Sequence, residues 1–131
     1  MNAKTWLIGE FNPYGQDPKY ALYPHPENAS GARLARVLEM APDAYLAAFE
    51  RRNLLSQAKW SAPLARESAR KLVEETSEGD SLVLLGARVS AAFGIDFRAH
   101  LFAVKEAGRT FGGTWRRATL VIPHPSGLSR E

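Results

Sequence analysis

The sequence predicts an α/β fold: a three-layer α/β/α domain around a mostly parallel, four-stranded central sheet. Three apolar runs without polar alternation, at 5–8, 82–85 and 118–122, are typical of parallel strands buried on both faces. Segments with helical spacing separate them, and strands that alternate with helices form parallel sheets covered by helices. With 131 residues, of which 45% are apolar, the chain is sized for a single domain over 1–131.

The first strand leads into a long loop, and two helices follow it. Prolines exclude a regular helix from 9–29, and a loop of this length in a small domain is usually functional. The run 30–40 has apolar residues at helical spacing, with Asn28 or Ser30 as its cap. Residues 43–52 repeat the helical pattern, and 53–56 form a connection. The inward face of this second helix is made of Tyr45, Leu46 and Phe49.

A longer helix and the central strand come next. Ser61 caps the helix, Pro63 lies in its first turn, and it continues to about Thr76. Its apolar stripe packs on the sheet and consists of Leu64, Ala65, Ala69, Leu72 and Val73. The continuous apolar run 81–85 predicts a central parallel strand.

The last third of the chain predicts a short helix and two strands. Residues 87–93 form the helix, which Gly94 closes. A weaker strand is expected over 100–104, followed by a turn over 108–113 and the final strand at 118–122.

Composition excludes several classes of protein. The chain has no cysteine, which rules out disulfides, thiolate zinc sites and iron–sulfur clusters, and we expect no metal and no cofactor. No segment approaches the roughly 20 apolar residues of a membrane span. A net charge of +3 is too small to indicate a nucleic-acid binder by itself. We expect a monomer in the cytoplasm.

Polar loops follow the first and the last predicted strands. The segment 9–14, Gly-Glu-Phe-Asn-Pro-Tyr, combines a carboxylate, a carboxamide and two aromatic rings, which are what a nucleobase pocket needs. After the last strand, prolines flank His124, the hydroxyl of Ser126 and the amide of Gly127 can hold a phosphate, and Leu128 offers an apolar tip that can wedge into a base stack. Because the carboxyl ends of parallel strands meet at one sheet edge, the two loops mark a candidate site.

With both loops in view, the chain resembles the uracil-DNA glycosylase superfamily. The segment 9–14 is similar to that family's first motif, Gly-Gln-Asp-Pro-Tyr, Gly-Glu-Ala-Pro-Gly or Gly-Ile-Asn-Pro-Gly, with one residue inserted. The segment 124–128, His-Pro-Ser-Gly-Leu, is similar to its late His-Pro-Ser-Pro-Leu motif at four of five places. The segment 82–87 is similar to the family's third strand region, so the resemblance spans nearly the whole chain.

The resemblance implies an activity and roles for individual residues. Asn12 would take the place of the residue that positions the attacking water, and Tyr14 or Phe11 would pack against the extruded base. His124 would stabilise the negative charge on the leaving base. The segment Arg-Asn-Leu-Leu around Asn53 is similar to one that reads the pyrimidine edge in several branches of the family.

The resemblance also implies DNA, single- or double-stranded, as the partner. Leu128 would fill the gap in a duplex and Ser126 would touch a phosphate, with Gly127 and Arg130 in the same DNA-binding loop. The expected reaction is hydrolysis of the N-glycosidic bond of uracil, or of a related damaged or modified pyrimidine, after the base has been flipped out of the helix.

The chain departs from the family pattern at the water-positioning residue. An asparagine has no usable basicity, so Asn12 can only orient water, and Glu10 or Asp17 would have to supply a carboxylate. The segment 15–18, Gly-Gln-Asp-Pro, spells the commonest first motif but lies six residues beyond the first strand, and we interpret it as coincidence. Two alternatives to a glycosylase are a catalytically weak or inactive nucleobase- or nucleic-acid-binding module of the same fold, and a general α/β interaction protein.

Overall fold

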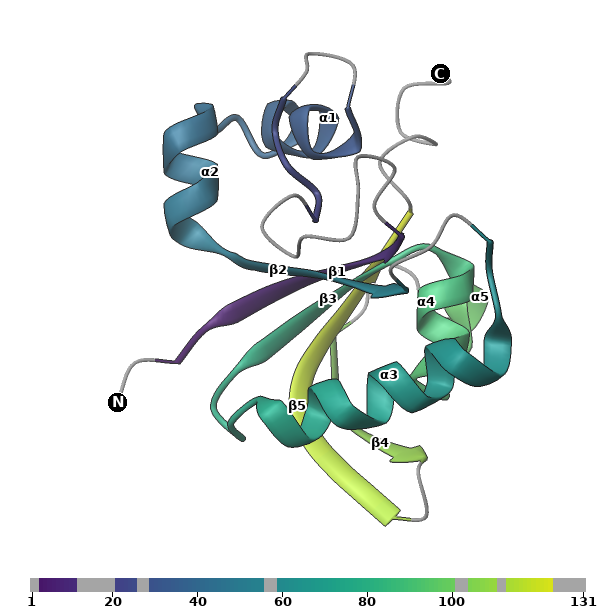
Figure 1. Cartoon of the computed structure of the whole chain (residues 1–131). Helices are drawn as coiled ribbons and strands as arrows, with labels where there is room; N and C mark the ends of the chain where they lie inside the picture. The colour runs from purple at the N-terminus through teal and green to yellow at the C-terminus, as the bar shows by residue number, and fades with distance from the viewer. Residues whose placement is uncertain are drawn as a thin grey trace.

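The protein is an α/β domain built on one twisted sheet. The computed structural model describes residues 3–11, 21–25, 29–55, 59–100, 104–110 and 113–123. Its strands are β1 (Thr5–Phe11), β2 (Glu50–Leu55), β3 (Ser81–Leu85), β4 (Val104–Thr110) and β5 (Gly113–Ile122). The strand order is β2-β1-β3-β5-β4, in which β2, β1, β3 and β5 are parallel and β4 runs antiparallel to β5 (Figure 1).

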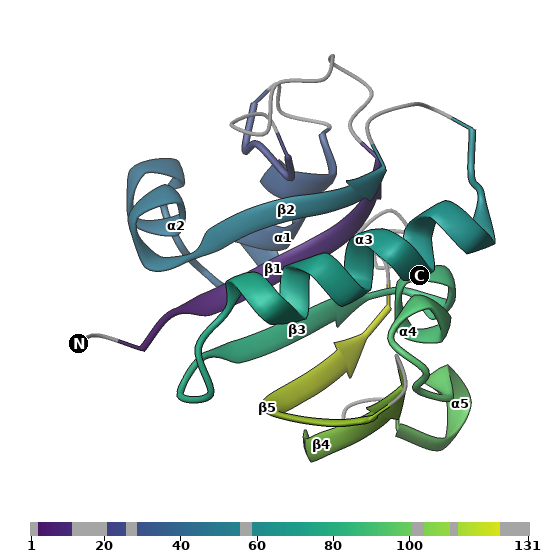
Figure 2. The ribbon, with the colours of Figure 1, turned by 60° about the horizontal axis from the view of Figure 1, so that its bottom comes forward.

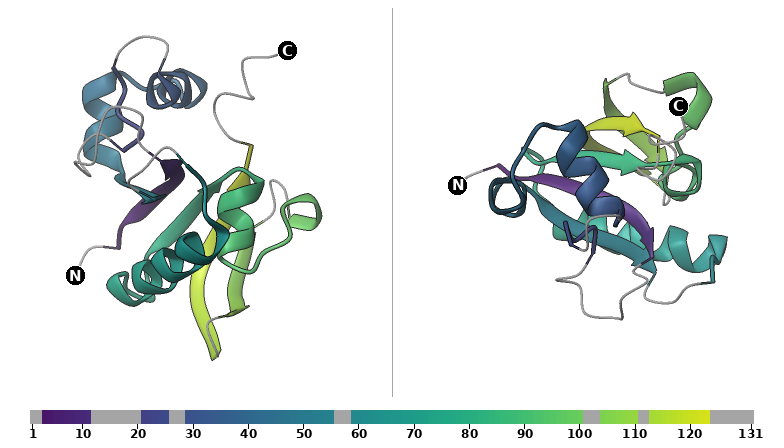
Figure 3. Two further views of the ribbon diagram at one scale, coloured as in Figure 1. Left: turned by 45° about the vertical axis from the view of Figure 1, so that its right-hand side comes forward. Right: turned by 90° about the horizontal axis from the view of Figure 1, so that it is seen from above.

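Helices cover both faces of the sheet. One face carries α1 (Ser30–Val37) and α2 (Pro42–Ala48), and the other carries α3 (Ala62–Glu75), α4 (Ala87–Ala92) and the short α5 (Phe97–His100). In Figure 3 the blue helices α1 and α2 lie on the opposite side of the sheet from the teal and green helices α3 and α4. The predicted fold class is therefore confirmed, while the sheet has five strands where the sequence predicts four.

The central strands are buried on both faces, as their apolar runs predict. In β1, Trp6 and Ile8 belong to the core under α3 and α4, whereas Leu7 belongs to the core under α1 and α2. In β3, Leu84 and Leu85 divide between the two cores in the same way. Successive side chains of a strand point to opposite faces, so each apolar run supplies both layers.

Helix α3 follows its local signals closely. The Ser61 hydroxyl accepts a hydrogen bond from the Leu64 N–H at 3.4 Å, and Thr76 ends the helix. Four of the five apolar residues of the predicted stripe are buried: Ala65, Ala69, Leu72 and Val73. The fifth assignment is wrong, because Leu64 lies on the solvent side of the first turn and is 53% exposed.

Two of the sequence predictions for helices need correction. The helix predicted over 43–52 begins at Pro42 and ends at Ala48, and Glu50–Leu55 is strand β2, an edge strand paired in parallel with β1. Polar residues such as Arg51 and Arg52 look like a helix surface in the sequence, but here they are half-buried side chains of an edge strand. The N-cap of α1 is Ala29, without a side-chain cap, rather than Ser30, which is the first helical residue.

The remaining strand boundaries also shift. The strand predicted over 100–104 is displaced, because residue 100 ends helix α5 (Phe97–His100) and β4 begins at Val104. The turn predicted over 108–113 is shorter, because Gly108 pairs with Trp115 and Thr110 with Gly113 in an antiparallel hairpin. This pairing extends β5 well upstream of the predicted 118–122. No helix in the described ranges is long and apolar enough to cross a membrane.

Candidate functional site

The strand order creates a switch in chain direction between β1 and β3. From β1 the chain passes to β2 on one side of the sheet, then crosses through α3 to β3 on the other side of β1. Ligands of open α/β sheets bind at the carboxyl ends of the strands that flank such a switch. In Figure 2 the arrowheads of the four parallel strands point to the side where α4 begins. This carboxyl edge is the candidate site.

The carboxyl edge brings together the starts of both loops that the sequence singled out. β1 and β5 each pair in parallel with β3, so the strands before the two loops end at the same edge, as predicted. Most of the predicted site residues lie outside the described residues. They are Asn12, Tyr14, Asp17, His124, Ser126, Gly127, Leu128 and Arg130.

The first motif begins inside a strand rather than in a loop. β1 continues to Phe11 because it pairs with β2 as far as the Phe11–Leu55 register. Phe11 is half-buried and packs against the core under α3 and α4. The Glu10 side chain is 20% exposed, and its Oε1 lies 3.6 Å from Nη1 of Arg88.

Asn53 lies beside the first residue of that motif. It is in β2, in register with Gly9 of β1, rather than in a connection. Its Oδ1 lies 2.6 Å from the position that a Cβ on Gly9 would occupy, and Cδ2 of Leu22 lies 3.3 Å from the same point. Two segments that the sequence linked to base binding separately are therefore in contact at this edge.

The end of β3 adds a cation to the edge. Gly86 has a φ of 96°, a conformation that residues with a side chain rarely adopt, and it turns the chain sharply from β3 into α4. Its N–H donates to the Ile122 carbonyl at 2.9 Å, which ties the ends of β3 and β5 together. Two residues later, the Arg88 guanidinium lies 5.8 Å from the ring centre of Trp60 and also contacts the carboxylate of Glu10.

Two hydrogen bonds hold residues 21 and 22 on the face of the sheet that α1 and α2 cover. Arg51 Nη1 donates to the Ala21 carbonyl, and the Tyr45 hydroxyl donates to the Leu22 carbonyl, both at 2.8 Å. Tyr45 is fully buried; burial raises the pKa of its phenol well above the usual range, although the nearby charge of Arg51 acts in the opposite direction. These two hydrogen bonds fix Ala21 and Leu22 to α2 and β2.

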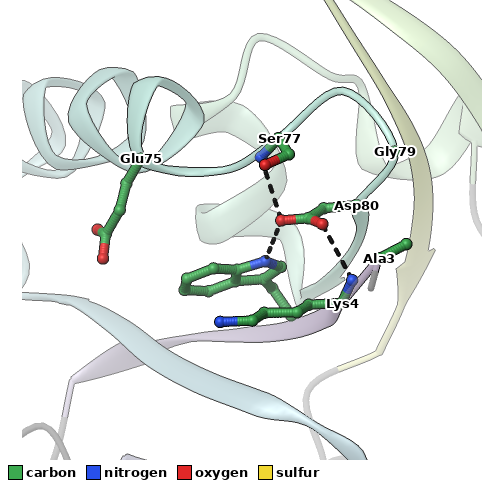
Figure 4. Close-up of a pocket in the computed structure, with 7 residues that line it drawn as sticks. Ala3, Lys4, Glu75, Ser77, Gly79 and Asp80 are labelled. Carbon is green, nitrogen blue, oxygen red and sulfur yellow. Dashed lines mark hydrogen bonds between the residues drawn. The ribbon is translucent and has the colours of Figure 1, made fainter. Parts of the chain in front are cut away.

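A hollow of about 520 Å³ lies at the opposite, amino end of the strands (Figure 4). Its central group is the buried carboxylate of Asp80, which accepts hydrogen bonds from the Lys4 N–H, the Trp6 indole N–H and the Ser77 N–H at 2.9, 2.9 and 3.1 Å. Burial raises the pKa of Asp80, but these three hydrogen bonds outweigh it and lower the pKa below its usual value. With its carboxylate satisfied by the protein, Asp80 joins β1 to the α3–β3 turn, and we assign it a structural role.

Neither the comparisons with known proteins nor a search for clusters of metal-binding side chains assigns a function to this edge. No model of a known protein family matches the chain, and a search of curated proteins finds no significant match. In the part of the chain that the structure describes, no group of three or more His, Asp or Glu side chains could hold a metal ion.

Sequence reasoning missed two residues of this edge, Arg88 and Trp60. The sequence contained a signal for Arg88. This residue comes just after a predicted central parallel strand, so it is expected to lie at the same sheet edge as the two loops. Trp60 precedes α3, and only the fold brings its ring under Arg88.

Proposed function

We propose that the protein is a DNA glycosylase that hydrolyses the N-glycosidic bond of uracil, or of a related damaged or modified pyrimidine. The observation that supports the proposal is that β1, which contains the start of the first motif, and β5, which precedes the second motif in the sequence, end at one carboxyl edge on either side of β3. The contact between Asn53 and the Gly9 position supports it further, because it joins a third segment similar to the family to the same edge.

In the proposed reaction the target base leaves the helix and enters this edge, where its hydrogen-bonding groups become accessible. The carboxamide of Asn53 would pair with the pyrimidine edge, while Phe11 or Tyr14 would stack on its ring. This carboxamide both donates and accepts hydrogen bonds, which suits a pyrimidine edge that carries both kinds of group.

Bond cleavage would then separate charge between the sugar and the base. The oxygen of a water molecule bonds to C1′ of the sugar, the N-glycosidic bond breaks, and its electron pair leaves with the base. His124 would donate a hydrogen bond to the departing base, where loss of one preorganised donor commonly costs about 3 kcal/mol. Asn12 would orient the water, and the carboxylate of Glu10 or Asp17 would take its proton.

Base release from fluorescent oligonucleotides tests the proposal. The panel contains single- and double-stranded DNA with uracil, mismatched thymine, hypoxanthine or hydroxymethyluracil. We expect abasic product from at least one pyrimidine substrate, and a roughly hundredfold loss of rate in His124→Ala. His25 is a matched control, since it is exposed and also lies in a Pro-His-Pro sequence, so His25→Ala should retain the rate. An equal rate in His124→Ala would contradict the proposed role.

A non-catalytic base-binding module is the second candidate. Two features favour it: Asn12, in the place that the resemblance gives to the water-positioning residue, has no basic side chain, and Oε1 of Glu10 lies 3.6 Å from Nη1 of Arg88. This protein would bind uracil-containing oligonucleotides and release no base. Single-turnover assays with enzyme in excess separate the two candidates, because even a slow glycosylase accumulates abasic product under these conditions.

A further inference from the structure

Arg88 is placed at the point where a strand-switch site receives its ligand. It follows β3 by three residues, on the first turn of α4, and it contacts the end of β1 through Glu10. Because Gly9 and Glu10 point to opposite faces of β1, Asn53 approaches this strand from the α1 and α2 side, and Arg88 approaches from the α3 and α4 side. Asn53 and Arg88 thus lie near the same carboxyl edge, on opposite faces of the sheet.

The contacts of Arg88 hold its guanidinium in place but leave its hydrogen-bond donors available. Its side chain is 57% exposed, and its polar contact within the described part of the chain is the 3.6 Å approach to Glu10, which is too long for a hydrogen bond. The Trp60 ring supports it through a cation–π contact at 5.8 Å. Such support restricts the side chain before a ligand arrives and so lowers the entropy cost of binding.

Four other arginines of the described regions have partners elsewhere in the protein. Arg52 pairs with Glu75 at 3.0 Å, and Arg70 pairs with Glu67 and Glu74 along α3. Arg51 and Arg117 donate to backbone carbonyls and are largely removed from solvent. Among these arginines, Arg88 combines a place at the carboxyl edge with exposed, loosely engaged donors.

We propose that Arg88 binds a backbone phosphate of the nucleic acid beside the base site. The inference rests on the proposed glycosylase function and adds a contact to it. A guanidinium forms two parallel, charge-assisted hydrogen bonds with a phosphate, which are shorter and stronger than the contact it has with Glu10. Phosphate contacts of this kind position the substrate and carry no sequence information, so Arg88 fixes the register of the DNA on the protein.

Binding of the phosphate also changes the surroundings of Glu10. When Arg88 turns its donors to the phosphate, the Glu10 carboxylate loses the cation that it approaches in the described part of the chain and becomes available to the water. The pair Glu10–Arg88 would thus couple DNA binding to the chemical step. A prediction specific to this coupling is that Glu10→Gln binds DNA more tightly than the wild type, because the phosphate no longer competes with a carboxylate for Arg88.

The salt dependence of binding tests the proposal. The probe is a short fluorescein-labelled duplex that carries 2′-fluorodeoxyuridine, a nucleotide that resists cleavage, and anisotropy gives Kd between about 50 and 200 mM salt. Each phosphate contact contributes about 0.9 to the slope of log Kd against log salt. We expect Arg88→Ala to reduce the slope by about 1 and to weaken binding severalfold at low salt. Arg88→Lys keeps the charge and should keep most of the slope.

The control is Arg98→Ala, which removes an exposed arginine of α5 that takes no part in the contacts of Arg88 with Glu10 and Trp60. It should leave the slope unchanged, and thermal unfolding of each variant shows whether the fold is intact. If the wild type binds DNA and Arg88→Ala has the wild-type slope, the role of Arg88 is wrong while the glycosylase proposal stands. A slope that falls equally in Arg98→Ala also overturns the role. A wild type that binds neither this duplex nor the same labelled strand alone overturns both proposals.

Discussion

The carboxamide of Asn53 occupies the space that a side chain on Gly9 would need. Its Oδ1 lies 2.6 Å from the position of the missing Cβ, closer than two such atoms can approach. The two residues are register partners in neighbouring parallel strands, so their side-chain positions lie on the same face of the sheet. The absence of a side chain at residue 9 therefore leaves room for the Asn53 carboxamide in this position.

Gly9→Ala should impair activity more than stability. The methyl group would displace the Asn53 carboxamide, which is the mobile end of a side chain, at a cost of about 1 kcal/mol in the free energy of unfolding. Base release should fall roughly as far as in Asn53→Ala, and the double variant should lose little more than either single one. Single-turnover rates and urea unfolding measure the two effects. Wild-type activity in Gly9→Ala, beside an inactive Asn53→Ala, would show that Gly9 does not orient Asn53.

Gly31→Ala should destabilise the protein severely, although alanine normally favours a helix. A Cβ on this residue of α1 would lie 2.0 Å from the Leu22 carbonyl oxygen and 2.3 Å from that of Tyr23, and backbone atoms cannot move aside as a side chain can. We expect a loss of at least about 2–3 kcal/mol in the free energy of unfolding. Gly79→Ala is the control, because its nearest neighbour would be the Ala3 side chain at 3.8 Å. Equal urea midpoints for the two variants would contradict the close packing at Gly31.

Asp80→Asn should lower stability in a pH-dependent manner. The asparagine cannot accept all three hydrogen bonds that the carboxylate accepts, and we expect a cost of about 1–3 kcal/mol at neutral pH. The folded protein lowers the pKa of Asp80, so the unfolded chain binds the proton more readily. This contribution is fully present above the unfolded pKa of about 3.9 and is lost as the pH falls through the folded value.

Urea unfolding of the wild type and Asp80→Asn between about pH 3 and pH 7 measures this effect. The difference between the two proteins should shrink in the acidic part of the range. Glu78→Gln, an exposed change in the same turn, should cost no more than about 0.5 kcal/mol. A difference between wild type and Asp80→Asn that is constant with pH would exclude a lowered pKa as its source.

Arg117→Met should destabilise the end of α3. The buried guanidinium donates from Nε to the Thr76 hydroxyl at 2.8 Å, and from Nη2 to the Val73 and Thr76 carbonyls at 3.1 Å. These carbonyls end the helix, where a positive charge is also favourable. Methionine fills much of the volume but donates nothing, so we expect a loss of about 2–3 kcal/mol in chemical denaturation. The exposed change Arg98→Met should have little effect, and equal losses would show that Arg117 is not specifically required.

Elements with strong local signals were predictable from the sequence, and elements defined by tertiary pairing were not. The cap Ser61 and the apolar residues that follow it specify α3 within one stretch of chain. Strand β2 lacks such a signal, because its polar residues are held by distant partners: Glu50 pairs with Lys4 and Arg52 with Glu75. A single edge pairing with β1, rather than an apolar run, makes this segment a strand.

The same distinction applies to the candidate site. Its place at the carboxyl edge was predictable, since it depends only on which loops follow parallel strands. The contacts of Asn53 with the Gly9 position and of Glu10 with Arg88 were not, because each joins residues more than forty positions apart in the chain. The first contact depends on β2, which the sequence presents as part of a helix and a connection.

Asn12→Asp should raise the rate of base release if the resemblance to glycosylases assigns this residue correctly. An asparagine orients water without taking its proton, whereas an aspartate can do both, and a positioned general base commonly contributes a factor of about 10²–10⁴. We expect at least a tenfold gain in single-turnover rate, within that range. Glu10→Gln in the same assay identifies the present base. Loss of activity in Glu10→Gln together with no gain in Asn12→Asp would identify Glu10 as the general base, because its carboxylate already lies at the edge of the sheet.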